Sequence, residues 1–284
     1  MPQNVCFAML PVFRPKRITA SSGFSQHWIQ AFMRIVFAIA LALSLLVLCT
    51  DGQAASREQI IVRTPAGDVL VESLTDGVGK ARPAVMILSG SKGFGAPAYE
   101  EIGRTFRAAG LDTYLVHVLS PADLKSIAGA GNARGRIQYY AKRMPDWIAT
   151  VRAVVTYLNG QPRHAGRVGV LGISLGAQIA AAASIDRADI GALLLVDGGF
   201  PNDEPQRVRS LPPLSLIWGG ADTIFPPSIG RKLQTLALGL GGPASLDIYE
   251  GAAHDFFLNL AARQARMAHT RAADFFVSQL LRNP

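Results

Sequence analysis

The chain has 284 residues, of which 49% are hydrophobic and 17% are charged, so it is too apolar for a disordered protein and long enough for one large α/β domain or two small ones. Its 2 cysteines exclude a disulfide-dense scaffold and leave no Cys/His cluster for structural zinc. The net charge of +8 comes from scattered basic residues, the densest group being Arg14, Lys16 and Arg17, so we expect no nucleic-acid partner.

Residues 1–54 have the pattern of an N-terminal extension followed by a secretory signal peptide. Arg34 precedes an apolar stretch of about fifteen residues, 35–49, and small residues follow it, which predicts cleavage after Ala54. At roughly 1.5 Å per residue this stretch is too short for the ~30 Å hydrocarbon core, so we expect no stable membrane span after processing. The predicted localisation is therefore the bacterial periplasm or the medium.

Three further possibilities concern this leader. Residues 1–32 would make an unusually long extension, so translation is predicted to start at Met33. Cys49 could carry a lipid, although Leu48 stands where a lipoprotein signal needs a small residue, and residues 35–49 could instead remain as a membrane anchor. Processing after Ala54 would leave 230 residues, with 24 basic and 19 acidic residues and no cysteine, and would exclude a cysteine nucleophile.

The pattern of residues 55–284 predicts one catalytic α/β domain in which strands alternate with helices. The first two strands flank a turn signal, Pro65-Ala66-Gly67, and form a hairpin, whereas the later strands are apolar runs typical of a buried parallel sheet. We expect a mostly parallel twisted sheet of about eight strands, covered by helices on both faces. The predicted strands are Gln59–Arg63, Asp68–Leu74, Ala84–Ser89, Leu111–Val118, Arg167–Leu171, Ile190–Val196, Pro213–Trp218 and Ala244–Tyr249; the predicted helices are Tyr99–Ala109, Arg136–Asn159, Leu175–Ile185 and Ala262–Leu281.

The region near 120–145 is expected to cover the ends of the strands. Ser120–Gly135 is rich in Gly and Ala and is predicted to be a loop or a short cap. The helix after it is expected to break at Pro145, because proline lacks the amide that continues a helix.

Gly172-Ile173-Ser174-Leu175-Gly176 lies between a predicted strand and a predicted helix. In this context the G-x-S-x-G pattern favours a nucleophile elbow, a tight turn that exposes the Ser174 hydroxyl at the carboxyl edge of the sheet. The amide of Leu175 would then face an oxyanion near the start of the helix. The alternative is a glycine-rich turn in which Ser174 only caps the helix.

Two further polar residues follow later strands. Asp222 lies in WGGADTIFPP and His254 in EGAAHDF, each directly after a strand and therefore at the same edge of the sheet as Ser174. Taken singly, Asp222 could be a turn former before the next helix, and His254 an ordinary loop histidine. The order Ser, Asp, His at successive strand ends is, however, the order of a hydrolase triad on such a sheet.

Other candidates for the same roles are less well placed. Among the remaining histidines, His117 ends a strand, His164 lies in a loop and His269 lies in the last helix. Asp197 is a rival for the acid, because it also ends a strand, one before Asp222. Asp255, next to His254, is predicted to cap a local helix.

The motifs LGISLG, WGGADTIFPP and EGAAHDF make the chain resemble the α/β-hydrolase family, and within it the dienelactone-hydrolase-like branch, over about residues 59–282. The resemblance implies Ser174 as nucleophile, His254 as general base and Asp222 as the acid that orients it. The namesake enzymes carry Cys at the position of Ser174, which argues against dienelactone as the substrate. Many hydrolases also have His-Gly after the third strand, where this chain has Ser89-Gly90.

The segment that follows Ala84–Ser89 is the expected oxyanion loop, Gly90-Ser91-Lys92-Gly93. Backbone amides in such a loop need a glycine-rich turn to point at one atom. We predict the amide of Ser91, with that of Lys92 as second choice, to act together with the amide of Leu175.

The predicted function is an exported serine hydrolase that cleaves a small-molecule carboxylic ester, lactone or thioester through an acyl-enzyme. The alternatives are a small serine peptidase and a non-catalytic binding protein on a hydrolase scaffold. No HExxH, paired-carboxylate or GxGxxG pattern is present, so we expect neither a metal nor a dinucleotide cofactor.

Overall fold

The computed structural model describes residues 57–281, apart from 75–79 and 202–206. The predicted leader, its start at Met33 and its cleavage after Ala54 lie outside the described residues. Among the helices of the described ranges, none is both long enough and apolar enough to cross a membrane.

One eight-stranded sheet forms the centre of the fold, in the order β1-β2-β4-β3-β5-β6-β7-β8. The first two strands form the predicted hairpin, β2 joins β4 antiparallel, and all later pairs are parallel, which confirms the predicted α/β-hydrolase sheet. The strands are β1 Glu58–Thr64, β2 Gly67–Ser73, β3 Ala84–Leu88, β4 Asp112–Val116, β5 Val168–Ile173, β6 Ile190–Val196, β7 Leu214–Gly219 and β8 Ala244–Tyr249.

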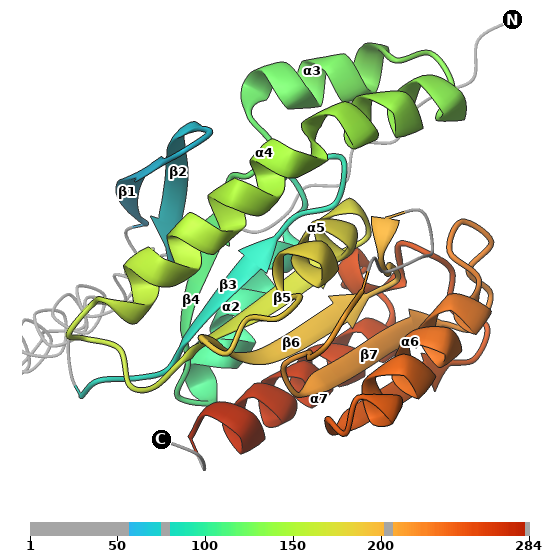
Figure 1. Ribbon diagram of the computed structural model, residues 1–284. Coiled ribbons are helices and arrows are strands. Elements are labelled where there is room, and N and C mark those ends of the chain that lie inside the picture. Colours follow the sequence, from blue (N-terminus) through green and yellow to red (C-terminus); the bar gives the residue numbers. More distant parts are fainter. Residues whose placement is uncertain (1–56, 75–79, 202–206, 282–284) are drawn as a thin grey trace, which may run out of the picture. The chain divides into compact units, whose positions relative to one another are not determined.

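The central strands β3, β5 and β6 are buried along their whole length, as their uninterrupted apolar sequences predict. Their side chains alternate between two cores: Met86 and Leu88 of β3 belong to one, Val85 and Ile87 to the other. Helices cover both faces (Figure 1), with α4, α5 and α6 over the first core and α2 and α7 over the second. The helices are α2 Ala98–Ala108, α4 Ala133–Asn159, α5 Leu175–Ala183, α6 Pro227–Gly239 and α7 Arg263–Leu280.

The predicted loop or cap at Ser120–Gly135 contains a helix, α3 Pro121–Gly129. Ser120 and Asp123 form a reciprocal capping box at its start, and Pro121 occupies the first turn, where its missing amide costs nothing. Because α3 begins five residues after the carboxyl end of β4, it lies at the edge of the sheet where the parallel strands end. In Figure 1, α3 and the first part of α4 extend beyond the sheet.

The expected break at Pro145 is wrong, because α4 continues through this residue. Pro145 and Ala141, whose carbonyl loses its helical partner, are both exposed, so water can satisfy that carbonyl. On the opposite side of the helix, Trp147, Val151 and Val154 are buried against the sheet and hold the helix continuous. The helix α6, which follows Asp222, was not among the predicted helices.

Candidate active site

Ser174 lies in the turn between β5 and α5, with a φ of 53°. Such a left-handed conformation is strained for a residue with a side chain, and it turns the hydroxyl away from both elements. The turn needs glycine on either side: a Cβ on Gly172 would collide with the Gly176 carbonyl, and one on Gly176 with the Leu88 carbonyl. These close contacts explain why G-x-S-x-G forms an elbow here.

Ser174, His254 and Asp222 form one hydrogen-bonded chain. The Ser174 Oγ lies 2.9 Å from His254 Nε2, and His254 Nδ1 lies 2.7 Å from Asp222 Oδ2. Because a carboxylate only accepts, Nδ1 carries the proton of a neutral imidazole and Nε2 accepts from the serine hydroxyl. The structure therefore brings together the three residues that the sequence analysis singled out. Ser174 is 80 positions from His254 in the sequence, and Asp222 is 32 positions from it.

The Asp222 carboxylate is fixed by the turn that follows β7. Its Oδ1 accepts the backbone amides of Ile224 and Phe225 at 2.7 and 2.9 Å, while its Oδ2 faces the imidazole. The Trp218 indole in turn donates to the Phe225 carbonyl at 2.7 Å. Asp222 is thus both the turn former and the partner of His254, two roles that the sequence presented as alternatives.

Asp197, the rival acid, ends β6 directly beside this group. Its Oδ1 accepts the Gly219 amide at 2.8 Å, and its buried Oδ2 has no hydrogen-bond partner in the described part of the chain. Burial, with the charges of Asp222 and Asp255, raises the pKa of Asp197 to about 8, and the Gly219 amide only partly opposes this rise. At neutral pH the side chain is therefore a protonated acid.

Asp197, Asp222 and His254 could each offer one atom to a metal ion, since these atoms lie within 4.8 Å of one another. Two observations argue for roles of these three side chains other than metal binding. The Asp222–His254 hydrogen bond already occupies the facing atoms, and the raised pKa of Asp197 keeps its carboxyl neutral at pH 7, when a metal ligand must be ionised.

The predicted oxyanion loop lies against the nucleophile. A Cβ on Gly90 would stand 3.6 Å from the Ser174 Cβ, and a hydrogen bond from the Gly93 amide to the Gly90 carbonyl (3.0 Å) closes the turn. Leu175 opens α5, where amides of the first turn have no partner inside the helix. Both amides predicted to bind an oxyanion, those of Ser91 and Leu175, thus belong to segments that border Ser174.

The cap reaches the same loop, which the sequence did not reveal. A Cβ on Gly93 would lie 3.1 Å from the Leu124 side chain of α3. Burial raises the pKa of Tyr140 on α4, and a hydrogen bond with the Ser91 side chain opposes that rise. The S-x-x-D capping box at Ser120 was the sequence signal that could have placed a helix here.

The predicted cap role of Asp255 is wrong. It precedes a short 3-10 turn, Phe256–Leu258, but its side chain makes no capping hydrogen bond. It instead pairs with Lys92 at 3.4 Å, and both side chains are exposed. This pair links the oxyanion loop to the loop that carries His254.

The other histidines lie where the sequence placed them, away from this chain of bonds. The His117 Nε2 lies 3.6 Å from Glu72, His164 is buried, and burial lowers the pKa of His164 to about 4. The His269 ring contacts the Phe257 carbonyl at 2.8 Å.

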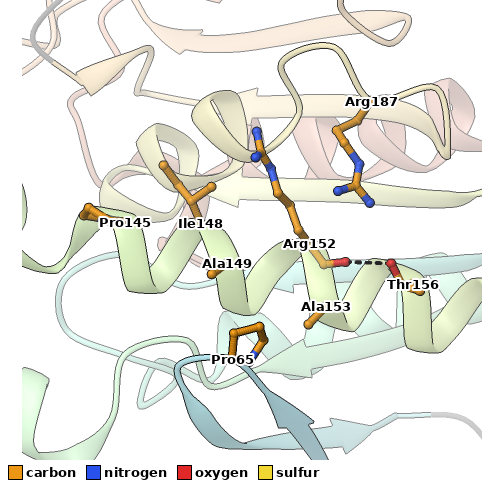
Figure 2. A pocket seen from close by; sticks show the side chains of 8 residues that line it. All are labelled: Pro65, Pro145, Ile148, Ala149, Arg152, Ala153, Thr156 and Arg187. Atoms are coloured by element: carbon orange, nitrogen blue, oxygen red, sulfur yellow. Dashed lines mark hydrogen bonds between the residues drawn. The ribbon is translucent and has the colours of Figure 1, made fainter.

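A shallow groove of about 370 Å³ runs along α4 (Figure 2), lined by Pro145, Ile148, Arg152 and Arg187 among others. Its two arginines already have partners: Arg152 donates to the Ala183 carbonyl at the end of α5, and Arg187 pairs with Asp189. None of its lining residues belongs to the Ser174–His254–Asp222 chain.

The sheet order and the elbow after β5 define an α/β-hydrolase fold. The chain belongs to the dienelactone hydrolase family, whose model matches residues 82–280. The predicted fold and family are therefore confirmed. A search of curated proteins found no match.

Solved structures share this fold at low sequence identity. A dienelactone hydrolase from Anabaena variabilis is 18% identical with a TM-score of 0.64, over 79% of this chain and 98% of that one. An esterase from Pyrobaculum calidifontis is 17% identical, with a TM-score of 0.61 over 78% and 84% of the two chains. An acylaminoacyl peptidase from Pyrococcus horikoshii is 13% identical, with a TM-score of 0.61, and the match covers 82% of this chain but 43% of the peptidase.

Proposed function

We propose that the protein is a serine hydrolase that cleaves a small-molecule carboxylic ester, lactone or thioester through an acyl-enzyme. The observation that carries this proposal is the chain Ser174 Oγ, His254, Asp222, with bonds of 2.9 and 2.7 Å, at a strained elbow. Family membership and the esterases among the structural neighbours support hydrolysis in general.

In the first half-reaction the Ser174 Oγ attacks the substrate carbonyl while His254 Nε2 takes the hydroxyl proton. The resulting imidazolium is stabilised by Asp222, which holds the Nδ1 proton at 2.7 Å. The carbonyl oxygen becomes an oxyanion and faces the amides of Leu175 and Ser91. When the bond to the leaving alcohol or thiol breaks, that group receives the proton from Nε2, and the acyl group remains on Ser174.

In the second half-reaction water enters where the leaving group stood. His254 Nε2 takes a proton from the water, whose oxygen attacks the acyl carbonyl, and the second oxyanion uses the same amides. When this second tetrahedral intermediate collapses, the bond between the acyl carbon and Ser174 Oγ breaks. Nε2 returns its proton to Ser174, and the carboxylic acid leaves. No other group is required, so the proposal includes no metal or cofactor step.

Two alternatives are weaker. A binding protein on this scaffold has no need for the strain at Ser174 together with the ordered His254 and Asp222. A peptidase finds support in the neighbouring acylaminoacyl peptidase, but more than half of that protein lies outside the match. A panel of esters, lactones, thioesters and short peptides separates these classes.

A labelling experiment tests the proposal. We expect a fluorophosphonate probe to modify the wild type, which also hydrolyses a short-chain nitrophenyl ester. Ser174→Ala should abolish labelling and reduce kcat by about 10⁶-fold, since Ser174 supplies the hydroxyl that contacts His254. Ser228→Ala, at an exposed serine in the first turn of α6, is the matched control and should keep both activities. Labelling that persists in Ser174→Ala would refute the assignment.

We also propose that the enzyme is exported, on the basis of the basic, apolar and small-residue pattern that ends at Ala54. Expression of the full chain in bacteria should yield periplasmic or secreted enzyme whose N-terminus, determined by sequencing, is Ala55. Enzyme that begins at Met1 or Met33, or that stays with the membrane fraction, would contradict cleavage and export.

A further inference from the structure

Asp197 is a buried carboxyl group that the proposed reaction does not use. It is 1% exposed, and one of its oxygens lies within 4.8 Å of an oxygen of Asp222 and of a ring nitrogen of His254. Among the described residues, one of its oxygens has a hydrogen-bond partner, the Gly219 amide, and the other has none. A buried polar atom without a partner costs free energy, so its retention here calls for an explanation.

Burial is the main reason that this group is neutral, and the charges of Asp222 and Asp255 add to the effect of burial. The groups that face Asp197 are the Gly219 amide at the end of β7, Asp222 in the turn after it, and His254 and Asp255 in the loop after β8. Two carboxylates so close together do not both ionise readily at neutral pH, and Asp222 accepts two backbone amides and the imidazole whereas Asp197 accepts one amide. The hydrogen-bond donors that favour a carboxylate are therefore concentrated on Asp222.

We propose that Asp197 is a second positioning acid for His254, which takes the place of Asp222 when the Asp222 carboxylate is removed. This inference rests on the proposed function, since it requires His254 to act as the base. Loss of the Asp222 charge removes one cause of the raised pKa of Asp197, so Asp197 ionises more readily. From at most 4.8 Å, an approach of about 2 Å brings an Asp197 oxygen to hydrogen-bond distance of a ring nitrogen of His254.

The proposal predicts different losses of kcat for two substitutions of Asp222. In Asp222→Asn the amide occupies the space of the carboxylate and donates to Nδ1, which fixes the wrong tautomer and blocks Asp197; we expect kcat to fall about 10⁴-fold. In Asp222→Ala the space is open, so the expected loss is only about 10²-fold. Adding Asp197→Asn to Asp222→Ala should lower kcat by about another 10²-fold, at least tenfold more than Asp197→Asn costs in the otherwise native chain.

The pH profile distinguishes this role from a structural one. The kcat of Asp222→Ala should rise with pH as Asp197 ionises, and this rise should be absent when Asp197→Asn is added. If Asp197→Asn only damaged the fold, it would lower kcat at every pH, but the rise of kcat with pH would remain. If Asp222→Ala does not fold, Asp222→Ser serves instead, because a hydroxyl can still accept the Ile224 amide.

Two results would overturn the inference: a loss in Asp222→Ala as large as in Asp222→Asn, or a cost of Asp197→Asn that is the same in both backgrounds. Failure of the proposed function is seen separately, because Ser174→Ala would then retain turnover. Each variant is made in the full chain, and its thermal unfolding is measured in parallel.

Discussion

Two buried aspartates, one in the cap and one at the end of β6, have opposite protonation states. Asp123 at the start of α3 accepts hydrogen bonds from Ser120, from the Tyr139 hydroxyl at 2.7 Å and from the Arg143 guanidinium at 2.9 Å, with the Trp147 indole at 3.4 Å. Although burial raises it, these donors lower the pKa of Asp123 to about 2. Asp197 has a single amide donor and carboxylate neighbours, and its pKa is about 8.

The difference shows that burial alone does not determine the charge of a carboxyl group in this protein. Both side chains are almost fully buried, at 1% exposure each, so desolvation acts on both. The number of donors and the sign of the nearest charge decide the result. The cap thus contains a charged carboxylate, whereas the pair His254 and Asp222 has a neutral carboxylic acid within 4.8 Å.

The largest expected effect concerns the pH dependence of stability at Asp197. Between about pH 4 and 8 the folded protein keeps a proton on Asp197 that the unfolded chain has released, so this group lowers the free energy of unfolding as pH rises, by up to about 1.4 kcal/mol per pH unit. Asp197→Asn removes this contribution. The variant should therefore gain stability relative to wild type as pH increases from 5 to 8, measured by urea unfolding at each pH.

Asp68→Asn, at an exposed position in the hairpin, is the control and should stay within about 0.5 kcal/mol of wild type at every pH. Parallel stability curves for wild type and Asp197→Asn would mean that Asp197 is ionised in the folded protein, and the contrast with Asp123 would disappear.

A smaller effect is expected at Asp123. Asp123→Asn leaves the half-buried Arg143 without its buried partner, so the free energy of unfolding at pH 7 should fall by about 3 kcal/mol. Because the pKa of Asp123 is lowered, its contribution is present above about pH 4 and is lost as pH falls towards 2, where wild type and variant should converge. Chemical denaturation at pH 7 and pH 2.5 measures both.

Asp146→Asn removes the other, more exposed partner of Arg143 and should cost less than about 1 kcal/mol. An equally small cost for Asp123→Asn would show that the cap does not depend on a charged centre.

The positions of the buried central strands could be predicted because their sequences are strongly apolar. Ala84–Ser89 and Ile190–Val196 are uninterrupted apolar runs, and the structure places β3 and β6 there within one residue. The continuation of α4 through Pro145 could not be predicted from the sequence, since it depends on which side of the helix faces water. The helix α3 was missed because its GA-rich composition concealed the capping box at Ser120.

The candidate site was predicted from the position of each residue at a strand end, but that rule cannot rank two acids on neighbouring strands. Asp197 and Asp222 end β6 and β7, which are paired, so both reach the same place. What separates them is the turn after Asp222, whose amides fix its carboxylate towards His254. The contact between Lys92 and Asp255 joins loops 163 residues apart and left no local signal.

The loop that carries His254 follows β8, which lies at the end of the described strand order and pairs with β7. During synthesis from the N-terminus, Ser174 emerges 80 residues before His254, the base proposed to activate it. A serine hydroxyl without its base is a weak nucleophile, so under the proposed mechanism a chain that ends before His254 is expected to be inactive. The proposed activity therefore requires the segment that follows β8, however much of the sheet has formed before it.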